Sequence, residues 1–118
     1  MSQWLGLSGR TAVITGAGGG IGKAVALELS ANGLHCNVLD RASELVVATV
    51  AEITKNGGQA TGHVCDVTDE AAIEAVAASI KTCDILVNAA GLVRPGALAD
   101  LTTVEWNDLL KVNLTGYF

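Results

Sequence analysis

The feature that most constrains this chain is a glycine-rich turn, in which five of the seven residues 16–22 are glycine. The apolar run at residues 12–14 precedes the turn and is typical of a buried strand. Beyond the turn, apolar residues recur at helical spacing, at Ile21, Ala24, Val25 and Leu29. A strand, a glycine turn and a helix in this order present backbone N–H groups to a phosphate at the helix N-terminus. The turn therefore predicts a nucleotide site in an α/β protein.

The spacing of the glycines distinguishes between the known phosphate-binding patterns. The pattern G-x-G-x-x-G would require glycine at position 21, which is isoleucine. The P-loop pattern, placed on Gly22-Lys23, would require glycine at position 17 and Ser or Thr at position 24, and both are alanine. The turn fits T-G-x-x-x-G-x-G instead, through Thr15, Gly16, Gly20 and Gly22. In this spacing the sequence resembles the short-chain dehydrogenase/reductase family.

Each glycine of the pattern has a separate expected role. Gly16, at the end of the strand, is expected to adopt a backbone angle that a side chain would forbid. Gly20 leaves no Cβ between the backbone and a pyrophosphate, and Gly22 allows the helix to pack close to the strand. Ile21 is assigned to the same cofactor-binding turn. The alternative is a glycine-rich turn that binds no ligand.

An acidic residue, Asp40, ends the next apolar run and lies 18 positions after Gly22. A carboxylate at about this distance accepts hydrogen bonds from the adenosine ribose of a dinucleotide and repels a 2′-phosphate. Arg41 is a counter-argument, because an arginine beside this position can hold a 2′-phosphate. We expect NAD, with NADP the less favoured cofactor. Asp40 can also cap the helix that begins near Ala42.

Periodicity and turn signals divide the chain into alternating strands and helices. Strands are expected at residues 11–15, 35–40, 60–65 and 84–88, and helices at residues 20–32, 43–55 and 69–80. Thr68 is expected to cap the third helix, and the capping box Thr102-Thr-Val-Glu105 to begin a long fourth one. Right-handed crossovers place the strands in the order 3-2-1-4. The expected fold is α/β, a partial Rossmann-like doubly wound parallel sheet.

The resemblance implies further cofactor contacts. In the family, an Asp followed by an apolar residue after the third strand touches the adenine, and Asp66 and Val67 match this pair. On the residues alone, Asp66 is equally well a turn residue. The family usually has Asn-Asn-Ala-Gly after the fourth strand, where this chain has Asn-Ala-Ala-Gly at residues 88–91. Asn88, which in relatives steadies the central sheet, and Gly91, which lies against the cofactor, are kept.

The resemblance also implies a catalytic group, of which this sequence carries one member. Asn113 matches the helix Asn whose backbone holds a water in the family's proton relay; the alternative is a solvent-facing polar residue. Relatives carry a catalytic Ser and a Tyr-x-x-x-Lys further on. In this sequence Phe118 follows Tyr117, and no Tyr has Lys four positions later. Ser79 precedes the fourth strand, so its position does not match the catalytic Ser of the relatives.

Residues 1–118 are therefore expected to form the NAD-binding, N-terminal portion of a longer single domain. The implied activity is hydride transfer between nicotinamide and a small-molecule secondary alcohol or ketone, with a 3-oxoacyl thioester or a polyol as candidate substrates. The resemblance also implies a homo-oligomer, a tetramer or dimer, in which the helix carrying Trp106 contributes to the interface. The alternative is a non-catalytic, truncated module that binds a nucleotide or a partner protein.

Charge and cysteine content exclude other classes. The net charge is −5 with dispersed acidic residues and no basic run, which argues against nucleic-acid or membrane partners. The first ten residues lack the apolar segment of a secretory signal. Cys36, Cys65 and Cys83 show no metal or redox spacing and favour reduced thiols in a cytoplasmic protein. His35 and His63 are expected to be structural, and no metal site is expected.

Overall fold

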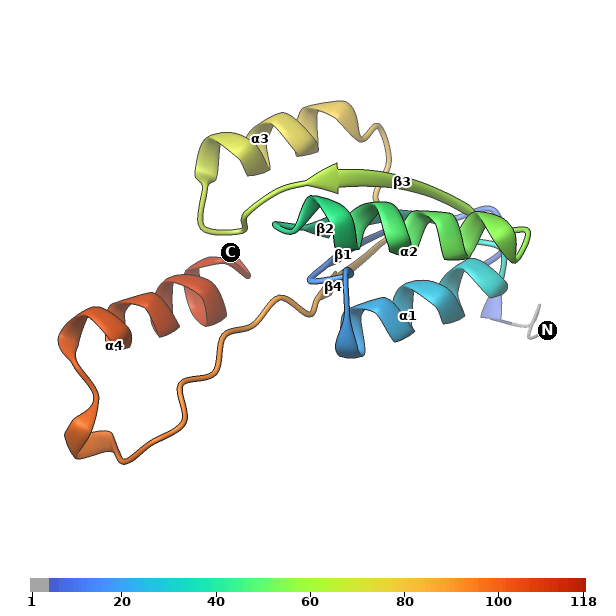
Figure 1. Ribbon diagram of the computed structural model, residues 1–118. Helices are drawn as coiled ribbons and strands as arrows, with labels where there is room; N and C mark the ends of the chain where they lie inside the picture. Colours follow the sequence, from blue (N-terminus) through green and yellow to red (C-terminus); the bar gives the residue numbers. More distant parts are fainter. Residues whose placement is uncertain (1–4) are drawn as a thin grey trace.

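The computed structural model describes residues 5–118; the first four residues of the chain lie outside the described part. It contains a four-stranded sheet in the order β3-β2-β1-β4, and every neighbouring pair is parallel. The strands are β1 (Thr11–Thr15), β2 (His35–Asp40), β3 (Gln59–Val64) and β4 (Ile85–Asn88). This confirms the predicted Rossmann-like α/β sheet and its strand order (Figure 1).

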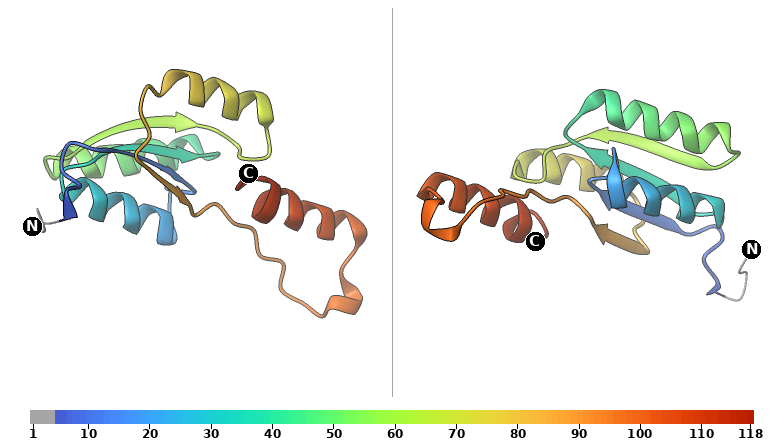
Figure 2. Two further views of the ribbon diagram at one scale, coloured as in Figure 1. Left: turned by 180° about the vertical axis from the view of Figure 1, so that it is seen from behind. Right: turned by 60° about the horizontal axis from the view of Figure 1, so that its bottom comes forward.

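Helices connect the strands as crossovers on both faces of the sheet. The crossover helices are α1 (Gly20–Ala31), α2 (Ser43–Lys55) and α3 (Glu70–Ser79), and α4 (Thr103–Leu110) follows the last strand. Helices α1 and α2 lie on one face of the sheet, and α3 lies on the opposite face (Figure 2). Most boundaries lie within one residue of the prediction. The expected cap of α3 was wrong: Asp69 is the N-cap, and its side chain accepts from Ala72 N, whereas the Thr68 hydroxyl donates to Asp66.

The two faces bury different amounts of apolar surface. Between the sheet and α1 and α2, a cluster of buried side chains is formed by Ala12, Ile14, Ala17, Ala26, Leu34, Cys36, Val38, Val46 and Ile53. On the α3 face, the buried residues are Val13, Leu39 and Cys65, against which half-buried residues of α3 pack. Ala17 of the glycine turn belongs to the first cluster, so the turn is built on the better packed face.

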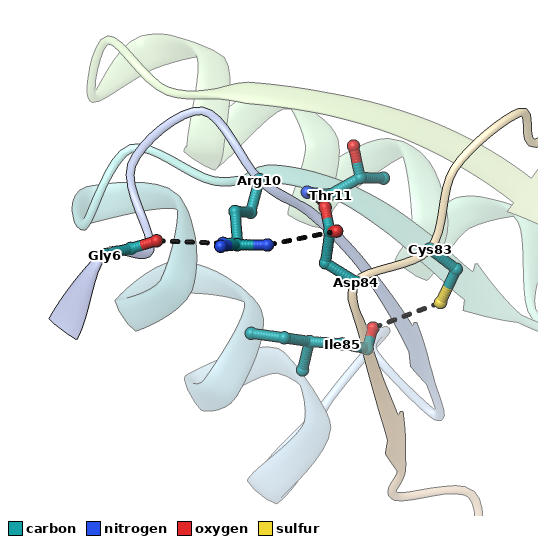
Figure 3. Close-up of polar contacts among 6 residues, drawn as sticks. All are labelled: Gly6, Arg10, Thr11, Cys83, Asp84 and Ile85. Carbon is teal, nitrogen blue, oxygen red and sulfur yellow. Dashed lines mark hydrogen bonds and ion pairs between the residues drawn. The ribbon is translucent and has the colours of Figure 1, made fainter.

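A hydrogen bond and an ion pair join the amino ends of β1 and β4, at the opposite end of the sheet from the turn. Asp84 Oδ2 accepts a 2.8 Å hydrogen bond from Thr11 N, and Asp84 Oδ1 lies 3.5 Å from Arg10 Nη1 (Figure 3). Arg10 Nε also donates to Gly6 O at 2.9 Å. These contacts place β4 in register with β1, so that Asn88 pairs with Thr15 at the carboxyl end.

The segment after β4 extends away from the sheet and gives the molecule its longest dimension of 49 Å (Figure 1). The capping box is confirmed: Thr102 Oγ1 accepts from Glu105 N at 3.1 Å, and Glu105 Oε2 accepts from Thr102 N at 3.0 Å. The expected long helix is interrupted, because α4 passes at Lys111–Thr115 into a wider π-helical turn. No helix among residues 5–118 is long and apolar enough to span a bilayer.

Candidate functional site

The glycine turn joins β1 to α1 in a conformation that requires its glycines. Gly16 has a φ of +64° and Gly20 a φ of +53°, both in the left-handed region that favours glycine. A Cβ on Gly16 would lie 2.7 Å from Ala90 Cα, and one on Gly22 would strike Gly16 O. The close packing expected at Gly22 is therefore observed, and it brings the start of α1 against the end of β1.

The N-terminus of α1 carries no side-chain cap. Its N-cap is Gly19, and its first turn contains no acidic residue. Gly19 and Gly20 are exposed, and a Cβ at Gly20 would meet nothing within 4 Å, so the backbone is open to approach. The first N–H groups of a helix have no intrahelical partner and carry partial positive charge. This end of α1 is suited to an anion, and the neighbouring Ile21 is 80% exposed.

Asp40 lies at the end of β2 and contacts the turn directly. Its Oδ2 accepts a 3.0 Å hydrogen bond from Gly18 N, and its Oδ1 accepts a 3.0 Å hydrogen bond from Ala42 N. The helix-capping alternative was wrong, because Ala42 is the N-cap residue of α2 and the helix has no side-chain cap; Asp40 instead forms a turn with Ala42 just before the helix. Each carboxylate oxygen can still accept a further hydrogen bond, such as one from a ribose hydroxyl.

Asp66 forms a turn after β3, as one of its two interpretations predicts. Its Oδ1 accepts hydrogen bonds from Thr68 N at 2.9 Å and from Thr68 Oγ1 at 2.7 Å. These bonds hold the pKa of Asp66 below its usual value, and the charges of Arg41 and Lys111 act in the same direction. The carboxylate therefore remains ionised at neutral pH. Val67 follows Asp66 and lies against Gly116: a Cβ added to Gly116 would be 2.8 Å from Val67 Cγ2.

A cleft of about 120 Å³ at the carboxyl ends of the strands collects half of the residues singled out in the sequence. Among the residues that line it are Gly16, Asp40, Asp66, Val67 and Gly91. The cleft is also lined by Arg41, Cys65, Ala90, Leu92 and Val112. The other predicted residues do not line it; they are Gly20, Ile21, Gly22, Asn88 and Asn113. Its lining comes from the carboxyl ends of all four strands, including β1 and β4, between which the strand order reverses. Open α/β sheets bind ligands at such a reversal.

Asn113 holds the loop that follows Gly91. Its Nδ2 donates to Leu92 O at 2.8 Å, and its Oδ1 accepts from Leu92 N at 2.9 Å. The side chain is also exposed, so the solvent-facing alternative is correct in part, although both of its amide atoms bond Leu92. A Cβ on Gly91 would lie 3.3 Å from Asn113 Oδ1, so the wide turn after α4 and the loop after β4 meet here.

Three side chains have positioning roles that were not predicted from the sequence. Thr15 Oγ1 accepts from Ala89 N and Ala90 N, each at 3.2 Å, and fixes the end of β4. Asn37 Nδ2 donates to Ala12 O between β2 and β1. Thr49 Oγ1 donates to Ala17 O at 3.0 Å, from α2 to the turn. Two signals were available: Thr15 belongs to the glycine pattern, and Thr49 is a polar residue on the apolar face of its helix.

The cysteine and histidine side chains make structural contacts. Burial and the nearby carboxylates of Asp69 and Asp66 raise the pKa of the Cys65 thiol, so that thiol is protonated at neutral pH. His63 Nε2 lies 3.0 Å from Asn37 Oδ1 across the β2–β3 pair. In the part of the chain that the structure describes, no three His, Cys, Asp or Glu side chains gather as metal ligands would.

Comparisons with known proteins agree with the fold described above. The family model described as "short chain dehydrogenase" matches residues 10–118. The chain is 40% identical to 2,3-dihydro-2,3-dihydroxybenzoate dehydrogenase of Bacillus subtilis over 96% of its own length and 45% of the relative's. It is 37% identical to D-threitol dehydrogenase of Mycolicibacterium smegmatis, covering 95% of this chain and 45% of that protein. The chain thus spans about half the length of the curated relatives it matches.

A similar solved structure carries a bound dinucleotide. It is a metagenomic short-chain oxidoreductase in complex with NADP, which matches with a TM-score of 0.84 and 38% identity. The match covers 92% of this chain and 52% of that one.

Proposed function

The chain belongs to the short-chain dehydrogenase/reductase family, and from that premise we propose that it is the cofactor-binding portion of an NAD-dependent oxidoreductase. The observation that carries the proposal is the uncapped N-terminus of α1, set beside the Asp40 carboxylate across the glycine turn. The first offers N–H groups to a pyrophosphate, and the second offers oxygen acceptors to a ribose. Such a dinucleotide supplies or accepts a hydride at its nicotinamide ring.

The residues present fit such a group. The open backbone at Gly19 and Gly20 would hold the pyrophosphate, Asp40 the adenosine ribose, and Asp66 and Val67 the adenine. Gly91 would lie against the nicotinamide half, held in place by the contacts of Asn113 with Leu92. In the whole enzyme, Asn113 would contribute to the proton relay.

NAD is the proposed cofactor because Asp40 places negative charge beside the ribose position. A 2′-phosphate would be repelled there. Two observations oppose this choice. Arg41 lines the same cleft, and the similar metagenomic structure holds NADP. Asp40 outweighs Arg41 in the proposal because its carboxylate is fixed by two hydrogen bonds next to the turn.

The variant Asp40→Ala tests this assignment. NAD affinity is expected to fall by about tenfold or more, since a hydrogen bond to a charged group contributes roughly 1.5–3 kcal/mol. The preference for NAD over NADP should shrink as well. Titration calorimetry with each dinucleotide measures both effects, and Glu74→Ala, which removes an exposed carboxylate on α3, is the charge-matched control. Unchanged NAD affinity in Asp40→Ala would remove the ribose assignment.

The substrate proposed is a small molecule with a secondary alcohol or ketone, such as a polyol or a 3-oxoacyl thioester. The similarity to D-threitol dehydrogenase, named for a polyol, supports the first of these.

The intact mass of the natural protein is the first experiment. About twice the 12.0 kDa of this sequence supports the enzyme, followed by an NAD-linked alcohol screen. A mass of 12.0 kDa supports the non-catalytic module.

We also propose a homo-oligomer, with α4 at the interface, in the cytoplasm. Exposed apolar side chains on α4, among them Trp106 at 49% and Val104 at 69% exposed, support a covering partner. The three free cysteines suit a reducing compartment. Sedimentation of the whole protein measures the oligomeric state, and a monomer at micromolar concentration would contradict this proposal.

A further inference from the structure

We propose that Thr49, on α2, is a positioning residue that holds the glycine turn in the shape that receives the dinucleotide. The inference rests on the proposed function and concerns a residue that would itself not touch the cofactor. It is carried by one hydrogen bond, by the burial of both partners, and by the contacts that the same peptide group makes with Asp40.

The contact between Thr49 and the turn is shielded from water. Thr49 is 0% exposed, and its Oγ1 donates a 3.0 Å hydrogen bond to Ala17 O. Ala17 is also 0% exposed, so water does not replace a lost donor at its carbonyl. Thr49 shares its helix face with the buried Val46 and Ile53. A hydroxyl buried on this apolar face would be destabilising without a hydrogen-bond partner, and the Ala17 carbonyl is that partner.

The peptide group between Ala17 and Gly18 is held at both ends. Thr49 holds its carbonyl, and Asp40 Oδ2 accepts from its N–H, on Gly18, at 3.0 Å. The preceding N–H, on Ala17, donates to Leu39 O at 3.0 Å. A turn with five glycines has access to many backbone conformations, and these three contacts from β2 and α2 select one.

Thr49 therefore acts on the ribose site through this peptide group. Without the hydroxyl, the peptide can rotate to seek another donor for its carbonyl. Rotation carries the Gly18 N–H away from Asp40 and releases the carboxylate from the turn. The open backbone at Gly19 and Gly20 follows directly in the chain, so its alignment changes as well. The effects of Thr49 and Asp40 on binding should consequently be coupled.

The test compares three variants of the natural, full-length protein in NAD titration calorimetry. Thr49→Val keeps the side-chain shape without the donor and is expected to bind NAD about tenfold more weakly, which corresponds to 1.4 kcal/mol. Thr49→Ser keeps the hydroxyl and should restore affinity to within about twofold of the original. The control is Thr54→Val on the same helix, whose hydroxyl donates to Val50 O of its own helix and not to the turn. It should leave affinity unchanged.

A double-mutant cycle separates positioning from general stability. Circular dichroism first establishes that each variant is folded at the titration temperature. In the Asp40→Ala background, Thr49→Val should then cost clearly less than the tenfold expected in the original protein, because the part of its effect that passes through the Asp40 carboxylate is gone. If Thr49→Val does not fold, Thr49→Ala takes its place with the same expectation.

Three results would overturn the inference. Unchanged NAD affinity in folded Thr49→Val, while the original protein binds NAD, would refute it and leave the proposed function intact. Additive losses for Thr49 and Asp40 would show that the two residues act separately. An original protein that binds no NAD would refute the proposed function, and with it this inference.

Discussion

The two faces of the sheet are built from similar helices, yet they bury very different amounts of apolar surface. Nine buried hydrophobic residues form the cluster under α1 and α2, against three under α3. Helices α1 and α2 each contribute buried residues, and α3 and α4 contribute none in the described part of the chain. One face is thus a closed core, and the other remains an open apolar surface.

The candidate site is divided between the closed core and the region after β4. The glycine turn, Asp40 and Thr49 belong to the closed core, where backbone and side chains fix one another. Asn113 and its loop belong to the region after β4, where most side chains are exposed. A groove of about 270 Å³ on the α3 face, which includes Val13 and Ile73, is open at Leu86, which is 57% exposed. Pyrophosphate and ribose contacts are therefore expected to be preorganised to a greater degree than contacts after β4.

The largest expected difference between the faces comes from truncating one isoleucine on each. Ile14→Ala removes a 0% exposed side chain from the closed core and should lower the free energy of unfolding by about 2–5 kcal/mol. Ile73→Ala removes a half-buried side chain of α3 and should cost less than about 1 kcal/mol. Urea denaturation of both variants measures the difference. Equal losses would show that α3 is packed as tightly as α1 and α2.

A second comparison lies within the glycine turn. Gly22→Ala places a Cβ against Gly16 O in the closed core and should destabilise the protein by about 1–3 kcal/mol, as overpacking does. Gly19→Ala is the matched control, because its backbone is extended and its Cβ would meet nothing within 4 Å. Thermal unfolding should give a clearly lower melting temperature for Gly22→Ala than for Gly19→Ala. Similar melting temperatures would contradict the close packing of α1 on β1.

The smallest expected effect is a pH dependence on the α3 face. Burial, and then the charge of His35, lower the pKa of His63 from its usual value of 6.5, so the folded state favours the neutral ring. Stability is therefore retained above pH 6.5 and lost as the pH falls from 6.5 through the lowered pKa. Unfolding measured between pH 7 and pH 5 should show this loss, and His63→Gln should remove that part of it. An identical pH profile in His63→Gln would contradict the assignment.

Local signals predicted the elements well. Strands β1 and β2 and helix α2 begin and end as predicted. The apolar runs that predict these elements and the glycine or asparagine residues that bound them lie within a few residues of each other. The cap of α3 was assigned to Thr68 in place of Asp69, since adjacent residues compete for the same N–H groups. The interruption of the last helix at Lys111 was not predicted, because it occurs where Asn113 meets a loop 21 residues away.

The sequence by itself determined the sheet, its strand order and the glycine turn between β1 and α1, because glycine spacing, periodicity and crossover handedness are local or general rules. Only the tertiary structure decided which side chains hold that turn. Thr15 meets Ala89 and Ala90 across more than 70 residues, and Thr49 meets Ala17 across 32. Such contacts leave no periodic mark in the sequence. They arise because a buried carbonyl or N–H must find whichever partner the packing of distant segments brings within hydrogen-bonding distance.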